Sequence, residues 1–569
     1  MQLKKFSPIT GVILATLLSA CGGDEPEPVV YPKLKISSLA LSSATASAIA
    51  QTPVEFTGGI CSGGNSNYIQ EFDFGDKTPV SSVKTHTYLT SGLKTVVATC
   101  KDTAGSRAVV TSLEVNVAAA EMNGFMGKQW STYASIDPLM PSLYPVAELT
   151  AAGDIYGVWL PSLASNKDVT TGTTNFSSSS WTQSGGLSTG SDKPLFNDAL
   201  PGASSAAIDL AVSPNGRATT AWMAGSSLWY ATKNDLSGAW STPVQINVPV
   251  LDASIKVVVN DAGSGAIAYC TSNGAELITY AGQARQAPVT ISKQCDLTDT
   301  SFFTIQRHRL FDIAIDNASS TIYAVGIADG ATTGKTVVTL KSYTPSGGWT
   351  AGTAISDEID TAPESLSYAR SPSGNFSAVA WNQVGTNLKS NVFARLYAKG
   401  AWGPIQAVQD DYITKDYSRP LVAINDSGDA FLAMQIQSIR KTFPIEVTNY
   451  DASATNPTWS KPFQVSTAKL SATDIAIDKW GTGLITRSDD DAAQSVSSGT
   501  PEAGTYSKSG EWSGFTRLAT KNLYSKSFHY QSMRALPDGR AIVVTSIYDD
   551  QTPMTLTTQP LSSGYVLLK

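Results

Sequence analysis

Runs of carboxylates are the residues of this chain whose type and spacing most directly suggest chemistry. Asp489-Asp490-Asp491 and Asp549-Asp550 each follow a short apolar strand. Side-chain oxygens grouped in this way can bind calcium, or can supply a general acid and a general base. Acidic runs between strands are also typical of solvated loops, and we favour that interpretation for both.

Chemistry based on histidine or on a cofactor has little support. The chain has 3 histidines, and neither His308 nor His529 has a Ser or Asp partner at a recognisable spacing. We therefore expect both to be surface or turn residues. No phosphate-binding loop, Cys-x-x-Cys motif or His-Glu-x-x-His motif occurs. The sequence thus assigns no catalytic residue, no metal site and no cofactor.

A group of aromatic, amide and guanidinium side chains is the candidate site for ligand binding. Its members are predicted at the ends of the second strands of a repeated unit, and they are Trp159, Trp222, Trp381, Asn382, Gln435 and Arg487. Aromatic faces beside amide and guanidinium groups suit sugar binding, by stacking and by bidentate hydrogen bonds. The alternative is that the tryptophans pack between neighbouring units.

A short hairpin recurs along the chain and must position these residues. The segment "LAVSPNGRATTAWM" (Leu210 to Met223) has counterparts in "YARSPSGNFSAVAWN" (Tyr368 to Asn382) and "RALPDGRAIVVTS" (Arg534 to Ser546). Eight such turns occur, at Ala152-Gly153-Asp154, Pro214-Asn215-Gly216, Asn260-Asp261-Ala262-Gly263, Asp316-Asn317-Ala318, Pro372-Ser373-Gly374, Asn425-Asp426-Ser427-Gly428, Asp478-Lys479-Trp480-Gly481 and Pro537-Asp538-Gly539. A third strand and a short outer segment follow each hairpin.

The outer segments carry a recurring tryptophan. The tryptophans are Trp130, Trp181, Trp240, Trp349, Trp402, Trp459 and Trp512, and Gln286 to Ser292 fills the one remaining place. Trp130 precedes the first turn, whereas no tryptophan follows the last one. The first outer strand is therefore available to complete the last unit.

Units of roughly fifty to sixty residues with four strands predict a β-propeller over residues 125–569. A propeller ring must close, because an open end leaves strand edges unpaired in water. We expect the strand near Trp130 to complete the last blade, and the tail from Met554 to Lys569 to supply inner strands of that blade. The count predicts eight blades, or seven if the unit with Cys270 and Cys295 is degenerate. A β-solenoid is the rival fold, but its coils are shorter.

Enzymatic propellers offer one comparison. "SPNGRATTAW" (Ser213 to Trp222) and "SPSGNFSAVAW" (Ser371 to Trp381) are superficially similar to the Asp-box turns of sialidases. The Asp is missing, however, the Trp lies too far along, and the turn is predicted between inner strands. No Arg-Ile-Pro motif and no clamp of three arginines is evident. Sialidase activity is therefore disfavoured.

Residues 33–119 are predicted to form a separate, small Ig-like β-sandwich. The stretch from Glu71 to Val117 resembles the polycystic kidney disease (PKD) domain, through Phe72, Asp73, Phe74, Gly75, Asp76, His86, Tyr88, Gly92, Asp102 and Gly105. Phe72 replaces the usual tryptophan, and Lys77 replaces the usual glycine. The resemblance implies a spacer or a contact module for carbohydrate or protein. Asp73 and Asp76 are either turn residues, which we favour, or a cation site.

The N-terminus is interpreted as an export signal. Lys4 and Lys5 precede an apolar run from about Ile9 to Leu18, which is too short to span a bilayer. The following "LSAC" closely resembles the bacterial lipobox, which implies a signal peptide over residues 1–20 and lipidation of Cys21. An ordinary signal cleaved nearby is the alternative. Residues 21–32 are an acidic tether, and Gly22 implies sorting to the outer membrane.

The number of cysteines agrees with an exported, lipid-anchored protein. Lipidation of Cys21 leaves four of the 5 cysteines, and these fall into two local pairs, Cys61 with Cys100 and Cys270 with Cys295. Disulfides in each pair suit an oxidising compartment.

The net charge and composition indicate which classes of molecule the protein could bind. Net charge is −7, and no basic cluster occurs, so nucleic acid is an unsuitable partner. The sequence therefore predicts a lipid-anchored cell-envelope protein that displays a propeller to bind a glycan or a surface protein. The alternative is a polysaccharide-active enzyme, a glycosidase or lyase, with acidic residues at the mouth of the ring. Whether the protein faces the periplasm or the cell surface stays open.

Overall fold

The computed structural model is all-β, and the chain divides into two units, Met1–Glu121 and Met122–Lys569. The structure describes residues 31–42, 48, 53–65, 67–88, 92–102, 108–117, 124–131, 134–135, 142–161, 177–182, 186–187, 193–194, 203–224, 227–235, 238–248, 250–282, 284–295, 310–384, 390–409, 416–437, 444–466, 472–490, 499–518, 531–548 and 561–568. Cys21, His308, Asp491, His529 and Asp549-Asp550 lie outside the described residues. No described helix has the length and apolar character needed to span a bilayer.

The smaller unit packs two three-stranded antiparallel sheets against each other. One sheet orders β2-β3-β6 and the other β5-β7-β8, while β1 pairs with β4. The strands are β1 (Lys35–Ile36), β2 (Leu39–Leu41), β3 (Pro53–Gly58), β4 (Cys61–Ser62), β5 (Tyr68–Asp73), β6 (Thr85–Thr87), β7 (Gly92–Asp102) and β8 (Ala108–Val117). Phe56 of the first sheet and Phe72 of the second share one buried core. Burial of apolar side chains between the sheets holds them together.

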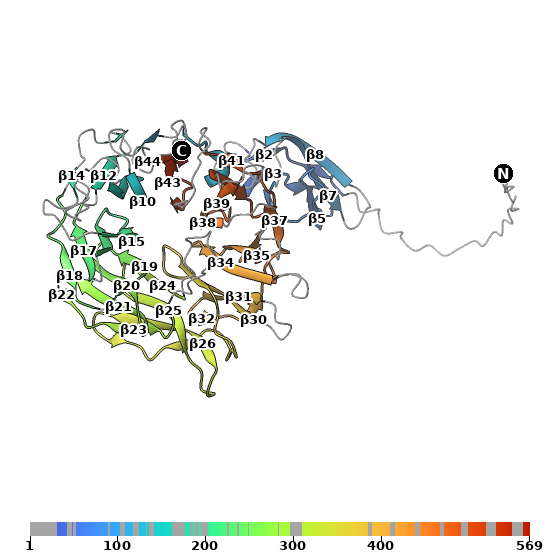
Figure 1. The fold of residues 1–569 in the computed structure, drawn as a ribbon. Helices are drawn as coiled ribbons and strands as arrows, with labels where there is room; N and C mark the ends of the chain where they lie inside the picture. The colour runs from blue at the N-terminus through green and yellow to red at the C-terminus, as the bar shows by residue number, and fades with distance from the viewer. Residues whose placement is uncertain are drawn as a thin grey trace, which may run out of the picture. The chain divides into compact units, whose positions relative to one another are not determined.

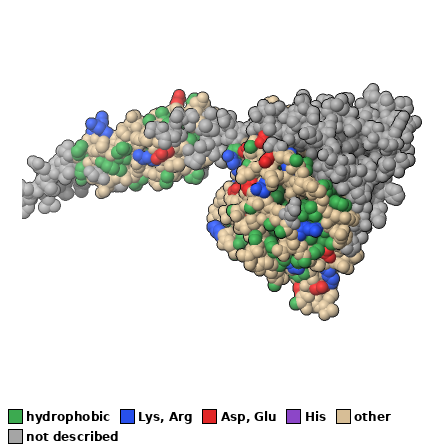
Figure 2. Space-filling model, turned by 90° about the vertical axis from the view of Figure 1, so that its left-hand side faces the viewer, with side chains coloured by type: hydrophobic (Ala, Val, Ile, Leu, Met, Phe, Trp, Pro, Cys, Tyr) green, Lys and Arg blue, Asp and Glu red, His purple; other side chains and the backbone are tan. Residues whose placement is uncertain are grey.

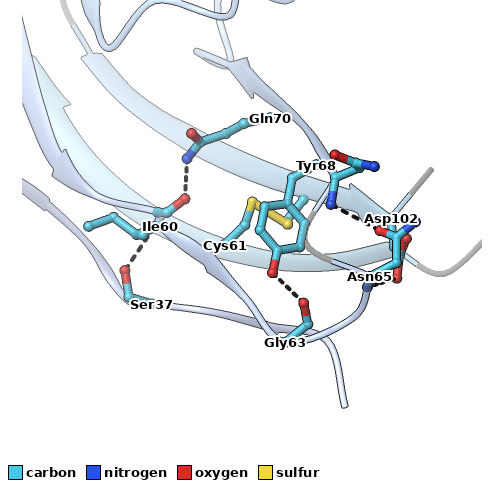
Figure 3. Close-up of a disulfide and its surroundings, with 11 residues drawn as sticks. Ser37, Ile60, Cys61, Gly63, Asn65, Tyr68, Gln70 and Asp102 are labelled. Carbon is cyan, nitrogen blue, oxygen red and sulfur yellow. Dashed lines mark hydrogen bonds between the residues drawn. A yellow bond between two sulfur atoms is a disulfide. The ribbon is translucent and has the colours of Figure 1, made fainter. Parts of the chain in front are cut away.

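A disulfide joins Cys61 to Cys100 in this unit, as predicted. Around it, Asp102 accepts a hydrogen bond from the backbone N–H of Asn65 at 3.0 Å, and the Tyr68 hydroxyl donates to the carbonyl of Gly63 (Figure 3). These bonds connect the end of β7 and the start of β5 to the loop after β4, so the disulfide lies in a well-bonded part of the sandwich.

The turn after β5 uses its carboxylates internally. Asp73 accepts the Gly75 N–H at 2.9 Å, and Asp76 accepts the Thr78 N–H at 3.2 Å and contacts His86 Nε2 at 2.6 Å. No cluster of potential metal ligands occurs among the described residues. Lys77 takes a positive φ of 69°, where glycine is usual in the PKD pattern. These contacts support the turn interpretation of both aspartates.

The larger unit contains, within its described residues, eight antiparallel sheets in which strands pair in chain order. The first four comprise β10 (Ser142–Leu149), β11 (Ile155–Pro161), β12 (Ser177–Thr182), β13 (Gly186–Leu187), β14 (Lys193–Pro194); β15 (Ala203–Val212), β16 (Ala218–Ala224), β17 (Ser227–Lys233), β18 (Val244–Ile246); β19 (Val250–Val259), β20 (Ser264–Thr271), β21 (Gly274–Ala281), β22 (Ala284–Arg285), β23 (Val289–Ser292); and β24 (Phe311–Ile315), β25 (Ile322–Asp329), β26 (Thr336–Thr344), β27 (Gly348–Trp349), β28 (Thr353–Ala354).

The remaining four sheets repeat the plan. They comprise β29 (Leu366–Arg370), β30 (Ser377–Val384), β31 (Ser390–Ala398), β32 (Ala401–Trp402), β33 (Gln406–Ala407); β34 (Asp416–Ile424), β35 (Ala430–Gln437), β36 (Ile445–Tyr450), β37 (Phe463–Ser466); β38 (Ala472–Ile477), β39 (Gly483–Asp490), β40 (Gly499–Tyr506), β41 (Thr516–Arg517); and β42 (Gln531–Ala535), β43 (Ala541–Tyr548), β44 (Leu561–Leu568), β9 (Ala134–Ser135). The first strand of each sheet contacts the first strand of the next, and β42 contacts β10. The sheets follow one another around a ring, in which β44 lies close to β10 (Figure 1).

All eight predicted turns join the first two strands of their sheets. In each, the residue at the left-handed position donates its N–H to the carbonyl that opens the turn, as from Gly216 to Ser213 at 2.9 Å. The position is glycine in seven turns and Ser320, with a φ of 58°, in the fourth sheet. Glycine adopts this conformation without strain, which is why the turn signal is readable in the sequence.

Hydrogen bonds from turn to turn run around the whole ring. In ring order they are Ala151 N to Pro214 O (3.0 Å), Asn215 N to Asp261 Oδ1 (2.8 Å), Asp261 N to Asn317 Oδ1 (2.9 Å), Arg370 to Asp316 (3.2 Å), Ser373 N to Asp426 Oδ1 (2.7 Å), Asn425 Nδ2 to Asp478 O (2.9 Å), Lys479 N to Pro537 O (2.8 Å) and Arg540 to Ala151 O (2.9 Å). Each sheet is thereby connected to its successor, and the eighth to the first.

The chain's early strand completes the eighth sheet. Gly564 of β44 pairs with Ser135 of β9, and Trp130 forms a further bridge with Leu568. The predicted pairing of the early strand with the last sheet is confirmed, because β9 lies along the outer edge of β44. The prediction that the tail supplies inner strands is wrong: β44 is the third strand, since residues 531–548 already form the first two.

The outer tryptophans mostly lie where they were predicted. Trp349, Trp402 and Trp459 each pair across strands with a tyrosine, with ring centroids 5.4–5.6 Å apart. Trp181 is an exception, because it lies in the third strand β12. The segment from Gln286 to Ser292 contains β23, which takes the outer place in the third sheet. A disulfide joins Cys270 to Cys295 there, as predicted.

Candidate functional site

Two of the predicted ligand-binding tryptophans lie in the packed interior. Trp222 in β16 and Trp381 in β30 are each 1% exposed. Trp222 packs with Val158 of the preceding sheet, and Trp381 donates its indole N–H to Gln383 at 3.0 Å. A second strand has neighbours on both sides and a sheet on each face, so its aromatic side chains are enclosed. This placement supports the alternative that these tryptophans pack between units.

Asn382 and Arg487 are also engaged within the fold. Asn382 accepts hydrogen bonds from the N–H and hydroxyl of Ser365, at 2.8 and 2.9 Å. Arg487 binds the carboxylate of Glu502, with Nη2 at 2.7 Å, and lies over the ring of Phe515. The two residues belong to different sheets, so the structure does not bring them together.

Gln435 is the exception within the predicted set. The residue is 1% exposed, and neither its Nε2 nor its Oε1 has a hydrogen-bond partner among the described residues. Trp159 lies in β11, opposite Ser177, but its side chain lies outside the described residues, as do those of Asp489 and Asp490. The predicted set therefore does not form one site among the side chains described.

Carboxylates do meet on the first strands. Arg534 of β42 binds Glu148 of β10 and, at 3.3 Å, Asp474 of β38. Burial raises the pKa of Glu148, although Arg534 opposes that rise, and the carboxylates raise the pKa of Arg534 despite its burial. Both acids are thus held by one guanidinium that spans three consecutive sheets and closes the ring.

Other first-strand side chains accept hydrogen bonds from the next sheet. The bonds run from Val257 N to Asp209 (2.7 Å), Tyr368 N to Asp312 (3.1 Å), Val422 N to Ser367 Oγ (3.2 Å) and Met533 N to Asp474 (3.2 Å). The first strand has one edge without a strand partner, and these acceptors satisfy its N–H groups. The first-strand acids therefore have a structural use.

A groove between the fourth and fifth sheets has the features expected of a ligand site. Its volume is about 810 Å³, within the range of about 300–1,000 Å³ that is usual for small-molecule sites. We call it the Arg370 groove. It is lined by Tyr323, Leu340, Thr353, Tyr368, Arg370, Gly374, Asn375, Phe376, Ser377, Tyr397, Lys399, Gly400 and Trp402.

Arg370 connects the two sheets that form this groove. Its guanidinium lies 4.0 Å from the ring centroid of Tyr323, and its Nη2 contacts Asp316 at 3.2 Å. The side chain is 10% exposed, and no acceptor for its Nε–H occurs in the described part of the chain. Burial tends to raise the pKa of Asp316, but the N–H of Ser319 and the guanidinium of Arg370 bring it below its usual value.

The turn after β29 is shaped to admit this ion pair. Gly374 has a φ of 74°, and a Cβ atom at this position would lie 2.2 Å from Oδ2 of Asp316. A side chain here would displace the carboxylate that Arg370 binds. Tyr397 and Trp402 form the outer wall of the groove, with ring centroids 5.5 Å apart.

Arg370 is a departure from the repeat. It stands directly before the turn, where the other first strands carry an apolar residue: Leu149, Val212, Val259, Ile315, Ile424, Ile477 and Ala535. The turns of the fourth and fifth sheets are also one residue longer than the others, since Asp316 bonds to Thr321 and Ser371 to Phe376. Places where a repeated design is broken are candidates for function.

The sequence contained a signal for this residue. When the eight turns are aligned, the position directly before the turn is a cation in one sheet and apolar in the other seven. The prediction considered only the ends of second strands. The walls contributed by Tyr323 and Trp402 were not foreseeable in the same way, because they come from different sheets.

Comparisons with known proteins bear on the fold. No family model matches the chain, and no curated protein is similar to it in sequence. Among solved structures, it is similar to the Dos1 propeller, at 12% identity and a TM-score of 0.39, covering 78% of this chain and 95% of that one. It is also similar to the β-propeller domain of the trilobed protease from Pyrococcus furiosus (8%, 0.37, covering 67% and 98%) and to a Penicillium chrysogenum α-L-arabinanase (10%, 0.31, covering 77% and 98%).

These neighbours are β-propeller proteins, and the ring of radially ordered antiparallel sheets in this chain has the β-propeller arrangement. Identities and TM-scores this low assign no activity. Function must therefore be argued from the residues of this chain.

Proposed function

We propose that this protein is a lipid-anchored cell-envelope protein that binds a saccharide in the Arg370 groove. In this proposal Cys21 carries the lipid and residues 33–119 form a PKD spacer. The larger unit is an eight-bladed propeller at the outer membrane. The complete circuit of turn-to-turn hydrogen bonds supports the count of eight, because every sheet takes part once.

The composition of the groove is the observation that carries the saccharide proposal. Tyr397 and Trp402 offer aromatic surface, against which the C–H faces of a sugar ring can stack. Burial raises the pKa of Tyr368 to about 12, so its hydroxyl stays neutral at physiological pH. The exposed side chain of Asn375 adds a neutral hydrogen-bonding group. Sites of this kind orient a ligand through a few polar groups on an apolar surface.

Figure 2 shows cationic, anionic and apolar side chains interspersed on the described surface that faces the viewer. The described surface in this view has no large apolar face on which a surface protein could dock. We therefore favour saccharide binding. Charge of both signs at the surface also suits a soluble, displayed domain.

A glycan array probed with the mature protein tests the proposal. We expect binding to at least one glycan, and at least about fivefold weaker binding after Trp402→Ala, if a sugar ring stacks on the indole with the roughly 1–3 kcal/mol found for nucleic-acid bases on aromatic rings. Trp349→Ala is a matched control, because Trp349 forms the same tyrosine pair in the fourth sheet. Absence of binding across the array, or equal loss in both variants, contradicts the proposal.

The lipid anchor is tested separately. Cys21→Ser removes the thiol that would be acylated, so the variant is expected in the soluble fraction without incorporated palmitate. Retention of palmitate in that variant contradicts the anchor, whatever the result of the glycan array.

A polysaccharide-active enzyme is the second candidate, and the pair Glu148 and Asp474 is the observation that favours it. Paired carboxylates are the usual means of glycoside cleavage. Release of reducing ends or unsaturated sugars from polysaccharides, lost in Glu148→Gln, would establish this function. Binding without product release supports the binding function.

A further inference from the structure

The charge of the Arg370 groove carries an inference that rests on the proposed saccharide binding. Its lining residues include two cations, Arg370 and Lys399, and no carboxylate. We propose that the groove selects saccharides that carry a carboxylate, such as hexuronates, which Arg370 and Lys399 bind. The chain as a whole has a net charge of −7, so the charge of the groove is opposite in sign to that of the whole protein.

Lys399 supplies a charge that the protein itself leaves uncompensated. The residue is exposed in the turn between β31 and β32, with a φ of 52°, and no acidic partner for it occurs among the described residues. Asp316, the one carboxylate against the groove's cations, is engaged by Arg370 and by the N–H groups of Ala318 and Ser319. One net positive charge therefore faces the ligand.

Arg370 can orient a bound carboxylate. Its Nη1 donates to Ser377 at 3.2 Å and its Nη2 to Asp316 at 3.2 Å, while its Nε–H has no acceptor among the residues that the structure describes. A buried donor without a partner is costly, and a ligand oxygen at the floor of the groove would provide the acceptor after a small movement of the side chain. The planar guanidinium matches the geometry of a carboxylate better than an ammonium does.

The aromatic wall distinguishes a sugar acid from a small anion. Tyr397 and Trp402 lie on the outer side of the groove, and Tyr323 lies beneath the guanidinium. A free anion would satisfy the cations but leave the aromatic faces uncovered. A ring that carries its carboxylate at one end satisfies both at once.

The test compares an oligogalacturonate with the same oligomer after complete methyl esterification, by titration calorimetry with the full mature chain. We expect the acid to bind at least about tenfold more tightly, because a charge-assisted pair contributes more than about 1.4 kcal/mol. Arg370→Leu and Lys399→Gln should each remove most of this difference and leave the ester unchanged. Arg370→Leu introduces the type of residue found at the equivalent position of the other sheets, and Asp316 keeps the N–H groups of Ala318 and Ser319 as partners, so the variant should fold.

Lys335→Gln is the control. Lys335 precedes β26, pairs with Asp360 at 3.3 Å and does not line the groove. Its removal should leave both affinities unchanged. Equal affinity for acid and ester, or loss of the preference in the control, overturns this inference and leaves the proposed function standing. If neither oligomer binds and the glycan array is also blank, the proposed function itself fails.

Discussion

Asp478→Asn should change how the stability of the ring depends on pH. Asp478 opens the turn of the seventh sheet and is 0% exposed. Its Oδ1 accepts the N–H groups of Trp480 and Thr482, each at 2.9 Å, and its Oδ2 accepts the N–H of Phe125 at 3.1 Å. Phe125 belongs to the 3₁₀ helix η1 (Gly124–Gly127), so the carboxylate secures the entry of the chain into the ring.

Burial raises the pKa of Asp478 to about 6, from a usual value of 3.8, although the three N–H groups favour the charged form. A folded-state pKa above the unfolded one means that the protonated form favours the folded chain. The stabilisation of the folded chain by protonated Asp478 is fully present below the unfolded-state pKa, and it is lost as pH rises through the folded-state pKa of about 6. The difference of about two pKa units corresponds to about 3 kcal/mol.

Urea unfolding followed by tryptophan fluorescence measures this effect. All 12 tryptophans lie between residues 130 and 512, so the signal reports the larger unit alone. Relative to Asp478→Asn, the wild type should lose about 3 kcal/mol of unfolding free energy between about pH 4 and about pH 8. A difference between the two proteins that stays constant over this range would refute the reasoning.

Asp316→Asn is the matched control, because Asp316 opens the equivalent turn of the fourth sheet. Its pKa lies below the usual value, so its contribution is present above the unfolded pKa and is lost only as pH falls further. The difference between wild type and this variant should therefore be flat over the same pH range.

Three other changes test the packing of the ring. Arg487→Met removes the nearer of two cations from the buried carboxylate of Glu502 and leaves the more exposed Arg517 at 3.8 Å, so the cost in urea unfolding should stay below the roughly 3–5 kcal/mol of a wholly unpaired buried charge; changing Arg487 and Glu502 together to Met should recover most of it. Replacing Cys270 and Cys295 together by alanine opens a link across a separation of 25 residues, and should cost about 3–4 kcal/mol in the same assay. Deleting residues 122–136 removes the partner of β44 and should lower the urea midpoint; an unchanged midpoint would contradict closure by the early strand.

Turns and cysteine pairs were the features most open to prediction from sequence. A hairpin with one left-handed residue depends on a few neighbouring residues, and glycine marks that residue in seven of eight turns. The disulfides were readable for a similar reason, since each pair lies within one compact unit. The pairing of the early strand with the last sheet was predicted correctly as well, because the chain begins with an outer strand that no first unit needs and ends with a unit that lacks one.

The ligand site was harder to predict. Trp222 and Trp381 have the residue type of a sugar platform, yet both are enclosed by neighbouring sheets. Burial of this kind depends on the facing sheet, whose residues lie far away in the sequence. Nothing within the segment of Trp222 itself distinguishes an enclosed second-strand side chain from one at an open edge.

The amino-acid order by itself determined the strands, the turns and the repeat, because these depend on backbone conformation and on alternation between neighbouring residues. Only the tertiary structure decided which side chains meet across sheets. Arg370, Tyr323 and Trp402 line one groove because the fourth and fifth sheets are neighbours in the ring. Distances between units are set by packing around the closed ring, and packing is a property of the whole fold.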